Sequence, residues 1–172
     1  MKHSKENKKY LIFSIDDKAY AVPVLSLHGV VANPNVSKLT AAPKFVTGNF
    51  HIGHFNIPII DLRLLLQKPD PTSPDKTCAI IVRVRFKEDD KLVGFIVDTV
   101  SGVNNIPEYK IGKLPSMGEN EFISRVTNIQ EQMIFFLDLN KIINEDNLIY
   151  FLNDFWSIEA DVKNESLNEA KT

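Results

Sequence analysis

The chain has 172 residues, of which 44% are apolar and 24% are charged, and its formal net charge is −2. It is therefore long enough for one compact domain or for two small lobes that share a core. The near-neutral charge offers no cationic field for a phosphate backbone, so we expect no nucleic-acid partner. No segment approaches the roughly 18 apolar residues of a membrane span, and the charged N-terminus precedes no signal-peptide core. We expect a cytoplasmic protein without direct membrane insertion.

The N-terminal part of the chain predicts a β-rich lobe over residues 9–66. Asp16 and Asp17 lie between two apolar runs, as in a hairpin with a tight turn. A second turn is expected around Gly53. In chain order, the predicted segments are strands at 10–15 and 18–22, a short helix over 23–28, extended structure at 30–39, and strands at 45–50 and 55–60.

Residues 67–77 carry three prolines and almost no apolar side chains, so they predict a connector between lobes. A second lobe is expected over 78–143. Within it, Arg83 and Arg85 alternate with apolar residues, which is typical of a strand with one solvated face. The predicted strands of this lobe are 78–86, 92–97, 101–106, 123–129 and 132–137.

A terminal helix is predicted over residues 146–158, because apolar residues recur there at helical spacing. Its apolar face could pack on the same domain or dock in a partner's groove; the first is the commoner arrangement for a terminal helix. The remaining residues, 1–8 and 159–172, are polar and are expected to be flexible tails. The apolar stripe comprises Leu148, Ile149, Phe151, Leu152, Phe155, Trp156 and Ile158.

One short pattern occurs twice, at residues 57–65 and 133–143: an apolar strand, then Asp-Leu, then an apolar helical turn. Asp is favoured as a helix N-cap because its carboxylate accepts hydrogen bonds from free backbone N–H groups. Asp61 and Asp138 are therefore N-cap candidates. The repeat predicts two related half-domains.

No enzyme motif is present. The Gly-x-Ser-x-Gly elbow, the P-loop and the His-Glu-x-x-His zinc pair are all missing, so we assign no catalytic residue and expect no cofactor. The best candidate for a metal site is His51 and His54, with Cys78 as a third ligand. Side chains at this strand-turn-strand spacing need not point the same way, so the alternative is a partly exposed turn. A small β-barrel regulator that binds metal or ligand remains an alternative function.

Several segments together resemble the CheW family, whose members are adaptors between chemoreceptors and the histidine kinase CheA. The resemblance covers about Tyr10 to Phe155 and continues in order through Ile106-Pro107, Phe122-Ile123 and the run from Met133 to Asp138. The segments that carry it are 10–13, 20–22, 46–50, 58–63 and 93–103.

The resemblance implies two SH3-like five-stranded β-barrel lobes with short helices and a C-terminal amphipathic helix. It implies a groove for the cytoplasmic tip of a chemoreceptor and a second contact to the regulatory domain of a CheA-type kinase. Such an adaptor is recruited to membrane-associated receptor arrays and can assemble into rings with the kinase or with itself. A related surface-motility (pilus) pathway is the alternative setting.

Position matching to the family also implies partner-binding residues, although each is also a plausible core residue, and for the valines the two readings are about equally supported. Two departures stand out: Gly29 replaces a family Glu, and Gly53 replaces the Arg of Asn-Leu-Arg-Gly, a motif that reads His-Ile-Gly-His here. In the family, this Glu and this Arg resemble an ion pair near the partner-binding surface. The loss of both residues avoids leaving one charge without its partner. The candidate partner-binding residues are Leu27, Gly29, Gly48, Ile52, Gly53, Phe95, Val97, Val100 and Val103.

Overall fold

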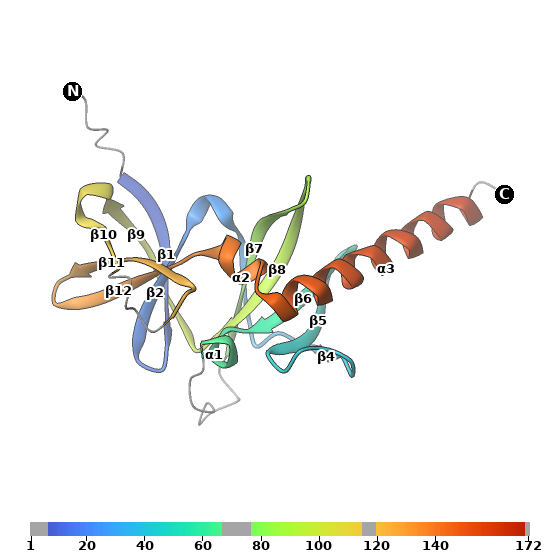
Figure 1. The fold of residues 1–172 in the computed structure, drawn as a ribbon, viewed down its shortest axis with the longest axis horizontal. Helices are drawn as coiled ribbons and strands as arrows, with labels where there is room; N and C mark the ends of the chain where they lie inside the picture. The colour runs from blue at the N-terminus through green and yellow to red at the C-terminus, as the bar shows by residue number, and fades with distance from the viewer. Residues whose placement is uncertain (1–6, 67–76, 115–119, 171–172) are drawn as a thin grey trace.

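The computed structural model describes residues 7–66, 77–114 and 120–170, and strands are the main element within them (Figure 1). This confirms the prediction of a mainly β protein. The strands are β1 (Asn7–Ile15), β2 (Lys18–Pro23), β3 (Leu27–Ala32), β4 (Ser37–Lys38), β5 (Val46–Ile52), β6 (Phe55–Asp61), β7 (Cys78–Phe86), β8 (Asp89–Val97), β9 (Thr99–Pro107), β10 (Gly112–Lys113), β11 (Ile123–Ile129) and β12 (Gln132–Leu137). The helices are η1 (Val24–Ser26), α1 (Leu62–Leu65), η3 (Glu108–Lys110), α2 (Leu139–Ile143) and α3 (Asp146–Ala170).

The strands form two six-stranded sheets, and each sheet takes strands from both sides of the connector. Sheet A has the order β10-β11-β12-β2-β1-β9, and sheet B has the order β4-β5-β6-β8-β7-β3. The predicted lobes 9–66 and 78–143 therefore do not coincide with the sheets. The reason is long-range pairing: β2 lies parallel to β12, and β8 lies parallel to β6.

The two sheets share one pairing pattern in which the halves of the chain exchange their first hairpins. In sheet A, the β1–β2 hairpin joins the last four strands of the second half. In sheet B, the β7–β8 hairpin joins the last four strands of the first half. The repeat predicted from the two Asp-Leu segments is thus present in the fold, with one hairpin of each half inserted into the other half's sheet.

Each sheet has six strands instead of the expected five, because a two-residue strand is added at one edge: β10 in sheet A and β4 in sheet B. Sheet B also curls on itself. The rings of His28 in β3 and Phe55 in β6 lie 6.5 Å apart between centroids, although two strands separate β3 from β6 in the sheet order. Curling of this kind brings the ends of a sheet toward barrel closure.

Three apolar clusters fill the interior, and strand alternation assigns side chains to them. Tyr10 and Ile12 of β1 pack inside sheet A, whereas Leu11 and Phe13 face the largest cluster, which also contains residues of sheet B. Ile57 and Ile59 belong to a third cluster inside sheet B. Strands buried on both faces read as continuous apolar runs, which explains the unbroken apolar stretches at β1 and β7.

One local prediction is confirmed and two are corrected. Asp16 and Asp17 have φ angles of 51° and 62°, the left-handed backbone of a two-residue hairpin turn. The expected helix over 23–28 is reduced to η1, because Leu27 already pairs with Val82 in an antiparallel ladder. Strand β8 starts earlier than expected, since its turn needs only Lys87 and Glu88.

The C-terminal helix is longer than predicted. Leu148, Leu152 and Trp156 are buried in the large cluster, so the apolar face packs on its own domain. Ile158 is 65% exposed and lies outside that buried stripe. The helix continues to Ala170, which corrects the expectation of a flexible tail over 159–172; no Gly or Pro interrupts residues 159–170.

The N-terminal tail is also shorter than predicted, because β1 starts at Asn7 instead of Lys9; residues 1–6 of the predicted tail and most of the predicted connector lie outside the described residues. None of the helices in the described ranges combines the length and apolar character needed to cross a membrane.

Candidate partner-binding surfaces

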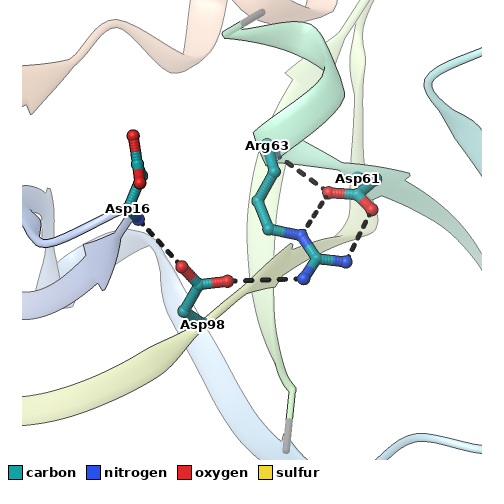
Figure 2. A network of polar contacts seen from close by, with 4 residues as sticks. All are labelled: Asp16, Asp61, Arg63 and Asp98. Carbon is teal, nitrogen blue, oxygen red and sulfur yellow. Dashed lines mark hydrogen bonds and ion pairs between the residues drawn. The ribbon is translucent and has the colours of Figure 1, made fainter. Parts of the chain in front are cut away.

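A buried arginine joins the two sheets on one side of the molecule (Figure 2). Asp61 caps α1 by accepting the backbone N–H of Arg63 at 3.0 Å, and the Arg63 guanidinium returns two bonds of 2.9 and 2.8 Å to the same carboxylate. The third bond of the guanidinium runs 3.3 Å to Asp98, whose other oxygen accepts the backbone N–H of Asp16 at 2.8 Å. We call these four residues the Arg63 clasp.

The clasp fixes the sheets relative to each other. Asp61 ends β6 of sheet B and Arg63 lies in the following helix α1, whereas Asp16 lies in the turn of the first hairpin of sheet A. Asp98 connects β8 of sheet B to β9 of sheet A. Hydrogen bonds to Asp61 raise the pKa of the Arg63 guanidinium, so the group stays charged and bound.

A cleft opens between the two sheets beside the second short helix, α2. Its volume is ≈ 330 Å³, and Arg83 and Arg85 of β7 line one wall. We call it the Arg83–Arg85 cleft. Its lining consists of Pro23, Ser26, Arg83, Val84, Arg85, Ser124, Leu137, Asp138, Leu139 and Asn140.

Two of the nine predicted partner-binding residues belong to the core. Phe95 is 2% exposed and Val97 is fully buried, and both pack in the large cluster between the sheets. Neither side chain can touch a partner, so their role is to support the interior. On the following edge strand, Val100 is half-buried against the same cluster, whereas Val103 is 51% exposed.

Four other predicted residues lie in sheet B near one another. Leu27 and Gly29 are half-buried in β3, and the contact between His28 and Phe55 brings this strand close to the β5–β6 turn. Ile52 is half-buried and Gly53 is exposed in that turn, with a φ of +56°. A Cβ at Gly29 or Gly53 meets no atom within 4 Å, so both positions face open space.

Gly48 has a structural reason for being glycine. A Cβ at this position would lie 1.9 Å from the carbonyl oxygen of Ser37 in the adjoining strand β4. Gly48 is buried, and the ladder of β5 with β6 shifts register beside it. It therefore allows β4 to approach β5 closely, as strand glycines often do.

The candidate metal ligands are not brought together as a set. His51 and His54 are exposed, and the nearest polar neighbour of the His51 ring is the amide nitrogen of Asn49 at 3.5 Å. Cys78 lies half-buried in β7, opposite Ala32. Within the described ranges, no three His, Cys, Asp or Glu side chains converge on one point.

Sequence reasoning missed the Arg63 clasp and the cleft. Arg63 lies in segment 58–63, which carries part of the family resemblance, and the expected N-cap role of Asp61 is confirmed. No local sequence pattern, however, pairs Arg63 with Asp98. Arg83 and Arg85 were expected to be solvated, and they are exposed. Their position beside α2 could not be read from alternation along one strand.

The comparison with known families decides the class of this protein. The family model described as "CheW-like domain" matches residues 9–147, which is most of the chain. The chain belongs to the CheW-like family. The resemblance expected from the sequence is therefore confirmed.

Named relatives of this CheW-like chain agree with that assignment. The chemotaxis protein CheW of Klebsiella aerogenes is 22% identical over 144 residues, covering 82% of this chain and 84% of that protein. The chemotaxis protein CheW of Bacillus subtilis is 23% identical over 146 residues, covering 83% and 91%. The crystal structure of the scaffolding protein TtCheW from Thermoanaerobacter tengcongensis matches with a TM-score of 0.70 at 25% identity, covering 81% of this chain and 89% of that one. This structural match confirms the CheW-like fold.

Proposed function

We propose that this chain is a non-enzymatic adaptor that couples chemoreceptors to a CheA-type histidine kinase in chemotaxis signalling. The observation that carries the proposal is the CheW-like family match over residues 9–147, together with relatives named chemotaxis protein CheW. The adaptor is recruited from the cytoplasm to receptor arrays at the membrane and assembles there with the kinase.

The mechanism is scaffolding, with no chemical step in the adaptor. A partner bound at sheet A and another at sheet B are held in one geometry by the Arg63 clasp and by the shared core. A small displacement of receptor helices then changes the position of the kinase, and the equilibrium between kinase states shifts by the difference in binding free energy. A rigid joint is required because a flexible one would absorb the displacement.

We assign the partner contacts to two exposed regions. One is the edge strand β9, where Val100 and Val103 are the candidates. The other is the surface shared by β3 and the β5–β6 turn, with Leu27, Gly29, Ile52 and Gly53 as candidates. Because Gly29 and Gly53 replace two charges, partners at the second region should present apolar or neutral groups instead of an ion-pair network.

Isothermal titration calorimetry against the regulatory domain of each CheA-type kinase of the same organism, and against its receptor tips, tests the function. Saturable binding in the micromolar range, about −8 kcal/mol, is expected for one kinase. The identity of that kinase also assigns the chain to chemotaxis or to surface motility.

Matched variants locate the kinase or receptor contact. Val103→Glu should weaken one partner by about tenfold, since it places a charge in an apolar contact. Met133→Glu is the control, because Met133 is similarly exposed at 45% on β12 of the same sheet. Failure of the wild type to bind any receptor tip or kinase domain would overturn the proposed function.

A further inference from the structure

The Arg83–Arg85 cleft is the counterpart of the Arg63 clasp in the repeated fold. Asp138 matches Asp61, because each follows the last strand of its half-chain, caps a short helix and donates its N–H to a phenylalanine carbonyl. Two positions after each aspartate, however, stand different residues: Arg63 in the clasp and Asn140 in the cleft. The short, exposed Asn140 side chain does not bridge the sheets, and a space of ≈ 330 Å³ is open there.

The charge of the cleft is opposite to that of the clasp. In the clasp, carboxylates surround one guanidinium. In the cleft, the guanidinium groups of Arg83 and Arg85 flank the opening, and one carboxylate, Asp138, is present. That carboxylate already accepts the backbone N–H of Lys141 at 3.2 Å. Two cations against one engaged anion favour a negatively charged occupant.

The side chains of the two arginines make few polar contacts within their own chain. Arg83 pairs through its backbone with Leu92 of β8, but among the described residues its side chain has no ion-pair or hydrogen-bond partner. Arg85 lies 3.9 Å from Asp90, with both side chains more than half exposed, so this contact contributes little. Residues two apart on a strand point to the same face, so Arg83 and Arg85 lie on one face of β7. Each can bind a carboxylate through two parallel N–H donors.

The rest of the cleft lining is mixed: Ser26, Ser124 and Asn140 are polar, whereas Pro23, Val84, Leu137 and Leu139 are apolar. Val84 is 5% exposed and Leu137 is 6% exposed, and both line the wall together with Leu139. The adjoining helix η1 contains Leu25, which at 91% is the most exposed large apolar side chain among the described residues. Two arginines beside a lining with both polar and apolar side chains, and with the exposed Leu25 on the adjoining helix, fit a peptide with acidic and apolar side chains better than a bare phosphate, which finds no apolar partner.

We propose that the Arg83–Arg85 cleft docks an acidic segment of a partner protein, with a carboxylate between Arg83 and Arg85 and a neighbouring apolar side chain against Leu139 and Leu25. This proposal deepens the proposed function, since it specifies the chemistry of one protein partner of the adaptor. It adds a contact beyond β9 and the β5–β6 turn.

The first test uses the full chain and a defined probe. Backbone and arginine side-chain NMR spectra are recorded during titration with a capped Glu-Leu-Glu-Leu peptide, a capped Gln-Leu-Gln-Leu peptide and inorganic phosphate. The proposal expects saturable shifts at Ser26, Ser124 and Asn140 with the acidic peptide, and their loss in Arg83→Gln/Arg85→Gln. Shifts that are equal for the Gln peptide, that survive in the double variant, or that appear with phosphate alone would overturn it.

The second test uses the proposed receptor tips and kinase domain. Arg83→Gln/Arg85→Gln should weaken one of them by about tenfold, the effect expected for losing charge-assisted hydrogen bonds. Lys38→Gln/Lys44→Gln removes the same charge from exposed positions in β4 and in the turn before β5, and should change affinity less than twofold. If the wild type binds a partner and both double variants bind it equally well, the cleft proposal is overturned but the proposed function is not. Absence of any wild-type binding overturns the proposed function, and the peptide titration then decides the cleft by itself.

Discussion

Asp61 and Asp138 hold equivalent positions in the two halves of the fold, but only Asp61 is paired with a buried arginine. The backbone N–H of Asp61 donates to the carbonyl of Phe45 at 2.7 Å, and that of Asp138 donates to the carbonyl of Phe122 at 2.8 Å. The two aspartate side chains differ in the groups that they bind. Asp138 caps a helix, whereas Asp61 caps a helix and also binds Arg63. One repeated element therefore serves as a joint on one side of the molecule and borders an open cleft on the other.

Loss of the arginine should destabilise the whole domain. Arg63→Ala leaves the buried Asp61 carboxylate without its charged partner, and removing one member of a buried pair costs about 3–5 kcal/mol. Urea unfolding followed by circular dichroism measures the change. The control is Arg85→Ala, which removes an exposed arginine with one weak contact and should cost less than about 0.5 kcal/mol. Equal destabilisation by the two substitutions would contradict the structural role of the clasp.

Gly48 should not tolerate even one methyl group. Gly48→Ala places a Cβ against the backbone of Ser37, which cannot move without separating β4 from β5. We expect a loss of about 2 kcal/mol or more in the free energy of unfolding.

Gly29→Ala is the matched control for Gly48→Ala, because a Cβ at Gly29 meets nothing within 4 Å. That variant should be neutral or slightly stabilising, by up to about 1 kcal/mol, since alanine restricts the unfolded chain. Similar melting temperatures for the two alanine variants would show that the close approach of β4 is not needed.

Trp156 should anchor the C-terminal helix to sheet B. Its ring packs edge-on against Phe86 with centroids 4.7 Å apart, the Lys91 ammonium lies 5.9 Å from its centroid, and only 5% of it is exposed. Trp156→Ala is expected to cost about 3–5 kcal/mol. Tyr150→Ala, at a position of the same helix that is 76% exposed, should leave the free energy of unfolding almost unchanged. Because Trp156 is the only tryptophan, its fluorescence in the wild type also reports helix docking directly.

Alkaline pH should destabilise the fold through Tyr20. Burial raises the pKa of this phenol above its ordinary value of 10.0, and the nearby Asp16 carboxylate adds to the effect. Above about pH 10 the unfolded chain therefore releases a proton that the folded chain retains, so the stabilising contribution is present below that pH and is lost as the pH rises, by at most about 1.4 kcal/mol per pH unit.

Tyr20→Phe should flatten the decline between about pH 10 and pH 11, whereas Tyr109→Phe, at an 80% exposed site, should follow the wild type. Urea midpoints measured across this range provide the comparison. Superimposable curves for wild type and Tyr20→Phe would rule out a buried phenol as the cause.

Local physics made much of this fold predictable. Hairpin turns at Asp16 and Gly53 were readable because few residues adopt left-handed backbone, and the caps at Asp61 and Asp138 were readable because a carboxylate satisfies free N–H groups within its own turn. Each of these signals lies within a few residues of its cause. The same holds for the apolar face of α3, whose period is set by one helix.

The sequence by itself determined a duplicated, mainly β chain with no catalytic motif, because composition, strand patterning and the repeated Asp-Leu segment are local features of the chain; the adaptor role was implied only by the resemblance to the CheW family. Only the tertiary structure decided which strands share a sheet: the exchanged hairpins depend on β2 meeting β12 and β8 meeting β6, pairings between segments far apart in the chain. It also decided that Phe95 and Val97 are core residues, that Arg63 reaches Asp98, and that Arg83 and Arg85 face a cleft. Alternation along a strand predicts that one face is buried and the other is not. Which element packs against each face depends on the packing energy of the whole chain.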